Sequence, residues 1–327
     1  QKVRGDTYRF LMRTPLREYL TRQPAGTALR AHISERRVRE SKDRNSYVAV
    51  VNGVSIPGDT IKVSYKRQKS IARADEKGNW VVWLEAMNAA EPDSLIISSR
   101  NETLVIDNVC VGDVWVCAGQ SNMEMSLRDT DTGMTDAGSA YDSHLRIAKI
   151  STRVETKPIS EVKQILWQET SPSSASAFSA IGYYFGAYLR NYQKIPIGLI
   201  QCAVGATPAE AWTPRHILDN DSDYDLIFER WRRSIEIYPD PEKTYEKAFA
   251  KWDKEADLAE KEGRPIPGAF PKLIGPDHPW TPSGLYNGMI HPLTFFPIKG
   301  VIWYQGEAAP ERAYQYRKLF RSLIGSW

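Results

Sequence analysis

Cysteine and net charge are both scarce in this sequence of 327 residues. Its three cysteines, Cys110, Cys117 and Cys202, form an odd set without metal-binding spacing, so we expect small buried residues rather than metal ligands. No apolar run approaches the ~20 residues of a membrane-spanning helix, so no membrane partner is expected. The formal net charge is only +3, which implies no polyanionic partner such as nucleic acid.

The composition is otherwise that of a globular protein, with 42% hydrophobic and 25% charged residues. The length allows two domains, or one large domain with a small appendage. The chain has ten tryptophans and sixteen tyrosines. Much of this aromatic surface is expected in the core, but it is also compatible with a carbohydrate substrate, because sugar sites use aromatic faces.

Residues 1–45 differ from the rest of the chain. They contain ten Arg and two Lys against five acidic residues, and no period of 2 or 3.6 is sustained. We interpret them as an irregular basic segment. A poorly ordered terminus is favoured over a basic arm for nucleic acid or membrane, and an out-of-frame translation is a further hypothesis.

Residues 46–111 predict a small β domain. Apolar and polar residues alternate in residues 60–65, which is typical of a half-buried strand. Short strands separated by Gly and Asn turns indicate a β-sandwich-like arrangement. The further strands expected here are residues 80–84, 94–97 and 103–106.

From residue 112 to residue 327 strands alternate with helices, which predicts an α/β domain with a doubly wound, mostly parallel sheet. A helical insertion is expected at about residues 214–282. The expected strands are residues 114–118, 145–150, 195–202 and 301–304, and the expected helices include residues 223–237, 242–262 and 312–327.

One helix of this domain has a recognisable start. Ser179 can accept a hydrogen bond from the first turn and is expected to be its N-cap. The residues expected on its apolar face, at helical spacing, are Ile181, Tyr184, Phe185, Tyr188 and Leu189.

The apolar run of residues 114–118 opens into a turn at Gly119, and Ser121 follows. A serine at this point stands at the carboxyl edge of a sheet, where open α/β folds bind ligands and where a nucleophile can act. The spacing is not that of the G-x-S-x-G elbow of α/β-hydrolases, since Gly119 lies two residues before the serine and Met123 two after. The string Gly119-Gln120-Ser121-Asn122-Met123-Glu124 resembles the nucleophile block of the SGNH-type carbohydrate esterases, in particular the sialate O-acetylesterase family.

Two further blocks carry this resemblance, which covers about residues 60–327. Pro208-Ala209-Glu210-Ala211-Trp212 matches the family's Pro-x-Glu-Ala-Trp, and it follows Gly205 and Ala206, where the family has two glycines. Residues 303–307 match Trp-x-Gln-Gly-Glu. The resemblance implies an SGNH-like, flavodoxin-like α/β fold after the small β domain.

The resemblance also implies a serine esterase site with Ser121 as the catalytic nucleophile. The oxyanion of the tetrahedral intermediate would be bound by the backbone N–H of Ser121, by that of Gly205 and by the side-chain amide of Gln305. No metal and no organic cofactor is implied. The residues expected to support the site are Gln120, Asn122 and Glu307.

The base is missing from this pattern. The family has its catalytic Asp and His together in an Asp-x-x-His or Asp-x-His segment after the Gln-Gly-Glu block, and these 327 residues contain no such segment there. His291 is interpreted as a packing or capping residue. We therefore interpret the esterase domain as incomplete and expect negligible turnover by residues 1–327. The five histidines are His32, His144, His216, His278 and His291.

The expected function is the hydrolysis of O-acetyl esters on carbohydrates, with sialic acid as the expected sugar and an acetylated carbohydrate as the only expected partner. The resemblance also implies an extracytoplasmic location, periplasmic or secreted, although no signal peptide is visible. The alternative is a catalytically silent carbohydrate-binding or interaction module that lacks the Asp and His pair. Acetylated xylan and other acetylated glycans remain open as substrates.

Overall fold

The computed structural model describes residues 10–12, 30–35, 49–85, 87–160, 165–236, 241–262, 275, 277–294, 296, 298–308 and 310–327. The chain divides into two compact units. Unit 1 is Gln1–Ser151, Ser160–Ala206 and Pro292–Gln305, and unit 2 is Thr152–Ile159, Thr207–His291 and Gly306–Trp327. Ser121, Gly205 and Gln305 therefore all belong to unit 1.

The sheet of unit 1 that leads to these residues is mostly parallel. Strand β11 (Ile197–Ala203) lies between β8 (Thr103–Gly119) and β9 (Asp142–Lys149) and runs parallel to both. Strand β12 (Gly300–Tyr304) is parallel to β8 on its other side, and β10 (Gln168–Thr170) is antiparallel to β9. The predicted α/β class with a mostly parallel sheet is confirmed.

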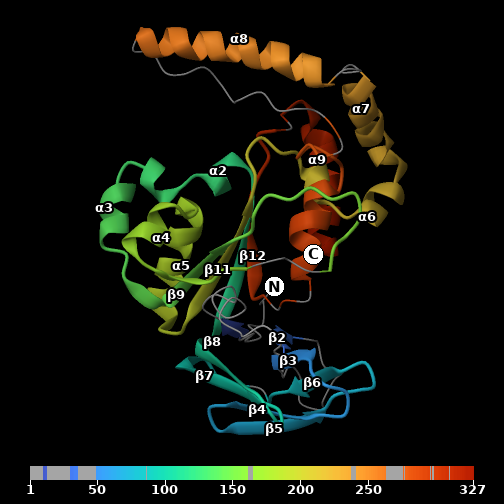
Figure 1. Cartoon of the computed structure of the whole chain (residues 1–327). Coiled ribbons are helices and arrows are strands. Elements are labelled where there is room, and N and C mark those ends of the chain that lie inside the picture. Colours follow the sequence, from blue (N-terminus) through green and yellow to red (C-terminus); the bar gives the residue numbers. More distant parts are fainter. Residues whose placement is uncertain are drawn as a thin grey trace, which may run out of the picture. The chain divides into compact units, whose positions relative to one another are not determined.

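Strand β11 is buried along its whole length, as expected for the apolar centre of a parallel sheet. Helix α5 (Ala180–Gln193) packs on β9 and β11 (Figure 1). The Gly182 N–H donates to Ser179 Oγ at 3.1 Å, so the predicted N-cap is confirmed. The other helices of this unit are α2 (Ser121–Glu124), α3 (Gly133–Gly138) and α4 (Pro172–Ser176).

The apolar face predicted for α5 is wrong at two tyrosines. Tyr184 is 41% exposed and Tyr188 is 70% exposed. The helix instead turns two glycines toward the sheet, and a Cβ added to Gly186 would lie 2.6 Å from Leu199 Cδ1. The face of α5 that packs on the sheet is therefore determined by close approach of the helix backbone and not by packing of the two tyrosines. Ile181, Phe185 and Leu189 do pack against the core, as predicted.

The small β domain is sandwich-like. One layer is the antiparallel run β5-β4-β7-β8, and the other is a three-stranded sheet in the order β2-β3-β6. A single buried core combines residues of both layers. The predicted strands at residues 60–65, 80–84 and 94–97 are confirmed. The bounds are β3 (Ala49–Val54), β4 (Thr60–Tyr65), β5 (Gln68–Arg73), β6 (Asn79–Trp83) and β7 (Ala90–Ser98).

Strand β8 joins this domain to the parallel sheet. Its first half is antiparallel to β7, and its second half is parallel to β11 and β12. The strands expected at residues 103–106 and 114–118 are therefore one strand of 17 residues. The domain boundary between residues 111 and 112 stays a prediction, and in the structure both residues lie inside β8.

The prediction that residues 1–45 are irregular is wrong for two short segments. Strand β1 (Phe10–Met12) pairs antiparallel with β8, and β2 (Arg30–Glu35) pairs antiparallel with β3. Residues 10–12 are all apolar and residues 30–34 alternate only briefly, so neither segment shows a sustained strand period. The other residues of this segment lie outside the described ranges.

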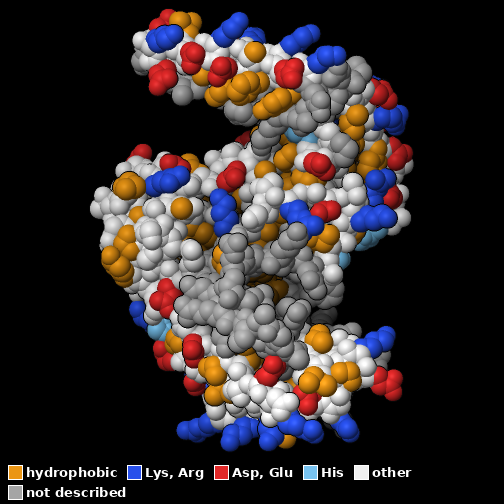
Figure 2. All heavy atoms as spheres, in the orientation of Figure 1, with side chains coloured by type: hydrophobic (Ala, Val, Ile, Leu, Met, Phe, Trp, Pro, Cys, Tyr) orange, Lys and Arg blue, Asp and Glu red, His pale blue; other side chains and the backbone are white. Residues whose placement is uncertain are grey.

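Lys and Arg side chains gather over the hairpin of β4 and β5, at the lower edge of Figure 2. This concentration of positive charge is local, since the whole chain carries only +3. The exposed cations of this hairpin are Lys62, Lys66, Arg67, Lys69 and Arg73.

Unit 2 contains the helices predicted for the insertion and for residues 312–327. Its small core includes Leu218, Tyr224 and Ile227 together with Leu319 of α9. Within the described part of the chain, no helix combines the length and the apolar content needed to cross a bilayer. The helices are α6 (Arg215–Asp219), α7 (Asp225–Glu236), α8 (Pro241–Lys261) and α9 (Ala313–Ser326).

Candidate active site

Three strands of unit 1 end side by side at one edge of the sheet. Gly119, the last residue of β8, pairs with Ala203 of β11 on one side and with Tyr304 of β12 on the other. The residues that follow these strands therefore emerge at the same carboxyl edge. The structure brings Ser121, Gly205 and Gln305 together there, in the part of an open α/β sheet that usually binds ligands.

Gly119 is required by the close approach of β12. Its φ is +147°, and an added Cβ would lie only 2.0 Å from the Tyr304 carbonyl oxygen. The next residue continues the contact, since the Gln120 N–H donates to this carbonyl at 3.0 Å. On the other side, the Val204 N–H donates to the Gly119 carbonyl at 3.1 Å. Only glycine fits at this position, between β12 and the segment that follows β11.

Ser121 is the first residue of α2, and it is exposed. Its carbonyl accepts from the Met125 N–H at 2.8 Å, which closes the short helical turn. The first N–H groups of a helix have no partner within the helix. Among the described residues, no hydrogen bond occupies the Ser121 N–H. Both the hydroxyl and this donor are therefore accessible.

The loop after β11 lies against the serine. A Cβ added to Gly205 would be 3.8 Å from Ser121 Cβ, which is ordinary van der Waals contact. The Gly205 N–H donates to Glu124 Oε2 at 2.6 Å. A carboxylate that accepts from a backbone N–H makes a strong, charge-assisted bond, so Glu124 ties this loop to α2. Sequence reasoning assigned no role to Glu124.

Ala206 replaces the second glycine of the family and keeps a left-handed backbone, with φ of +57°. This conformation costs a residue with a Cβ roughly 1–2 kcal/mol. The turn therefore holds its shape without the second glycine, and the bond between Gly205 and Glu124 stabilises it.

Gln305 is buried and contacts the residue before the serine. Its Nε2 donates to Gln120 Oε1 at 3.1 Å, and the Gln120 side chain is itself buried. A side-chain amide nitrogen carries two N–H groups, of which this bond uses one.

The two remaining supporting candidates differ in position. Asn122 lies on α2, beside Ser121, and is half-buried. Glu307 is exposed and belongs to unit 2. The direct contacts described above thus join Gln120 with Gln305, and Glu124 with Gly205.

The three cysteines are free and buried, as predicted. Burial raises the pKa of the Cys117 thiol, which is close to the site in sequence, to about 12, and that of Cys110 to about 11. Burial also raises the pKa of Cys202. These buried thiols are neutral near neutral pH and cannot be reached by a substrate, whereas the Ser121 hydroxyl is exposed.

Several residues of the family blocks hold unit 2 together. The buried carboxylate of Glu210 accepts from Arg312 Nη1 at 2.5 Å. Trp212 Nε1 donates to Thr207 Oγ1 at 3.0 Å. His291 Nδ1 lies 2.8 Å from the Ile159 carbonyl oxygen, a contact that suits the packing or capping role expected for it.

Comparison with known proteins gives a consistent result. A family model described as carbohydrate esterase, sialic acid-specific acetylesterase, matches residues 111–240. The sialate O-acetylesterase of Mus musculus is 28% identical over 299 residues, which cover 85% of this chain and 52% of that protein. The human sialate O-acetylesterase is 28% identical over 301 residues, 85% of this chain and 49% of that protein.

These matches support the sialate O-acetylesterase family for this chain. It spans about half the length of the curated relatives it matches. Among solved structures, it is similar to a carbohydrate acetylesterase from Xanthomonas citri, with a TM-score of 0.64 and 29% identity over 86% of this chain and 52% of that one. The SGNH-like fold expected of a sialate O-acetylesterase agrees with this similarity. The residues matched by the family model include Ser121 and Gly205.

Proposed function

We propose that this chain carries the nucleophile and the oxyanion donors of a carbohydrate O-acetylesterase, with O-acetylated sialic acid as its substrate. The observation that carries the proposal is the contact between Ser121 and Gly205 at the strand edge where Gln305 also emerges. The names of the relatives support the reaction class, since they are sialate or carbohydrate acetylesterases.

The reaction follows from these groups. Ser121 Oγ attacks the acetyl carbonyl, the sugar hydroxyl leaves with a proton, and water then releases acetate from the acetyl-serine. The Ser121 N–H and the Gln305 amide would bind the oxyanion. Gly205 can contribute only if its N–H is shared between Glu124 and the oxyanion, because Glu124 accepts from it at 2.6 Å.

The base is a His paired with an Asp in the family, in a segment that this sequence does not match. Activity is therefore best measured in a chimera that joins this chain to the segment of the Xanthomonas citri acetylesterase that follows the matching region. The extracytoplasmic location implied for the family remains part of the proposal.

Ser121 should react with a serine-directed organophosphate in the chimera, because its hydroxyl is exposed beside the proposed oxyanion donors. Mass spectrometry of the labelled peptide identifies the site, and Ser121→Ala is the control. Labelling at another serine, or labelling that persists in Ser121→Ala, would refute the assignment. Binding of acetylated sugar without any labelling or turnover would favour the silent binding module.

Gln305→Ala should lower kcat of the chimera by roughly a hundredfold or more, as the loss of one oxyanion donor does. KM should change less, because the donor acts mainly on the charged intermediate. Gln305→Glu is the matched variant, since it keeps the side-chain shape but replaces the amide N–H donors with a carboxylate oxygen. Its kcat should fall at least as much as that of Gln305→Ala. An unchanged kcat in Gln305→Ala would remove this residue from the site.

A further inference from the structure

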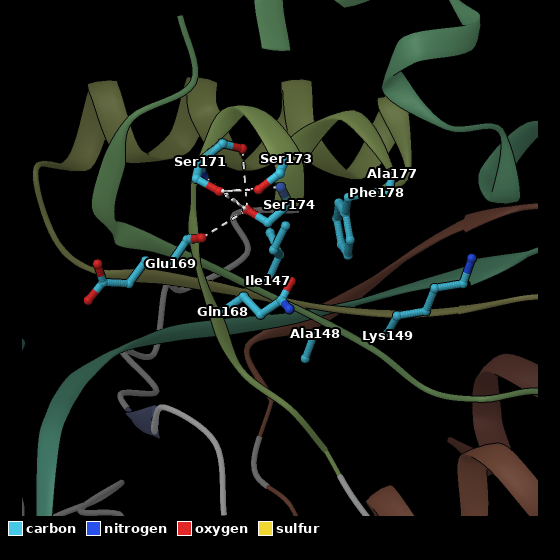
Figure 3. Close-up of a pocket in the computed structure, with 10 residues that line it drawn as sticks. All are labelled: Ile147, Ala148, Lys149, Gln168, Glu169, Ser171, Ser173, Ser174, Ala177 and Phe178. Carbon is cyan, nitrogen blue, oxygen red and sulfur yellow. Dashed lines mark hydrogen bonds between the residues drawn. The ribbon is translucent and has the colours of Figure 1, made fainter. Parts of the chain in front are cut away.

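A pocket of unit 1 lies between the sheet and helix α4. It has a volume of about 580 Å³, which is within the usual range for small-molecule sites. Figure 3 shows residues of β9 and β10 on one side of the pocket and the start and end of α4 on the other. The lining residues are Ile147, Ala148, Lys149, Gln168, Glu169, Ser171, Ser173, Ser174, Ala177 and Phe178.

The pocket lining combines hydroxyl and apolar groups, which together can bind a sugar. Three serine hydroxyls lie along one wall, and Ser171 Oγ is 3.2 Å from Ser173 Oγ and 3.1 Å from Ser174 Oγ (Figure 3). Phe178 and Ile147 supply buried apolar surface to the pocket. Hydroxyl groups bind the rim of a sugar ring, while apolar and aromatic groups contact its face.

The charged residues of the pocket lining are Lys149 and Glu169. Glu169 Oε1 accepts from Asn108 Nδ2 at 2.6 Å and lies 3.7 Å from the buried Arg146 guanidinium. The Lys149 ammonium group makes no hydrogen bond or ion pair with any other residue that the structure describes. This group is thus available for an acidic ligand, while the carboxylate opposite is already compensated.

The pocket is also close to the edge that carries Ser121. Lys149 is the last residue of β9 and pairs with Gln201 of β11, two residues before the end of that strand. Strand β11 separates β9 from β8, and neighbouring strands are about 4.8 Å apart, so β8 and β9 are about 10 Å apart. A glycan attached to the sugar at Ser121 could reach across this distance.

We propose that this pocket is a subsite for a carboxylate-bearing sugar, with Lys149 binding the carboxylate and the Ser171–Ser174 segment binding hydroxyl groups. The acidic sugar here is separate from the acetyl group that reacts at Ser121. The choice of ligand rests on the proposed carbohydrate function, but binding at this pocket needs no catalysis.

The test is a titration of the full chain with N-acetylneuraminic acid, followed by backbone amide NMR shifts. Amides of residues 147–149 and 168–178 should shift, and neutral N-acetylmannosamine should bind at least tenfold more weakly. Lys149→Met should weaken acid binding by about tenfold, the scale of one lost charge-assisted bond. Lys77→Met, which removes an exposed lysine from the turn before β6, is the matched control. It should leave the affinity for N-acetylneuraminic acid unchanged.

Several outcomes would overturn the subsite. These are no shift up to the solubility of the sugar, equal binding of the neutral sugar, or equal effects of Lys149→Met and Lys77→Met. Ser121→Ala separates this inference from the proposed function, because it should abolish the esterase activity of the chimera and leave the titration of the full chain unchanged. Esterase activity without binding at this pocket would leave the function standing and refute the subsite alone.

Discussion

Residues 1–327 alone are expected to hydrolyse p-nitrophenyl acetate at least about four orders of magnitude more slowly than the chimera that supplies the family's Asp and His. Without a His to take its proton, the Ser121 hydroxyl is a weak nucleophile near neutral pH. Oxyanion donors alone leave only residual catalysis when members of a triad are removed. The measurement is the hydrolysis rate that depends on Ser121, obtained by subtracting the rate of Ser121→Ala for each protein.

A rate on the order of 1 s⁻¹ or faster from residues 1–327 alone would contradict this expectation, because it is typical of a complete enzyme. A base would then exist among the present histidines. His291→Ala would be the first variant to test, and its contact with the Ile159 carbonyl would have to break for the ring to act as a base.

Gly119→Ala is expected to disrupt the edge where the proposed active site lies. The new Cβ would be 2.0 Å from the Tyr304 oxygen and 2.7 Å from its carbonyl carbon, and backbone atoms cannot move aside as a side-chain tip can. Strain from the positive φ and overpacking together should lower the free energy of unfolding by about 3 kcal/mol or more. The midpoint of thermal unfolding should fall by roughly 5–10 °C.

Gly138→Ala is the matched control for this variant. Gly138 is the exposed last residue of α3, and an added Cβ would meet no atom within 4 Å. Its thermal midpoint should stay within about 1–2 °C of the unchanged protein, since exposed substitutions away from special features have small effects. Equal stability of Gly119→Ala and Gly138→Ala would show that β12 does not approach β8 as described.

Much of the strand order could be predicted from the sequence. Residues 60–65 alternate because one face of β4 is buried, and β11 is apolar except at Gln201 because both of its faces are covered. The cap at Ser179 is a local interaction, so local sequence is enough to predict it. The strands of residues 1–45 could not be predicted, because their pairing with β8 and β3 depends on distant partners.

The buried face of α5 shows a second reason why a prediction from sequence can fail. Its periodicity suggested that Tyr184 and Tyr188 would be buried, but two glycines at the same spacing offer closer backbone contact with Leu199 and its neighbours. A hydrophobic pattern counts apolar side chains and gives no weight to glycine, although glycine allows the shortest helix-to-sheet distance.

The residues of the candidate site could be predicted from motifs, but the hydrogen bonds between them could not. The spacing of the blocks indicates that Ser121, Gly205 and Gln305 each follow a strand. The bond from Gln305 to Gln120 and the bond from Gly205 to Glu124 depend on the register of three parallel strands, which no local pattern encodes. The catalytic roles themselves stay predictions until the variants are measured.

The central position of β8 has a consequence for synthesis on the ribosome. Gln120 and Gln305 are 185 residues apart, so at about 5–20 residues per second the ribosome needs roughly 10–40 s to pass from one to the other. During that time β12 cannot yet pair with the flank of β8 beside Ser121, and an open strand edge promotes association with other chains. The yield of folded protein in a cell should therefore depend on translation speed and on chaperones that cover this edge until β12 is made.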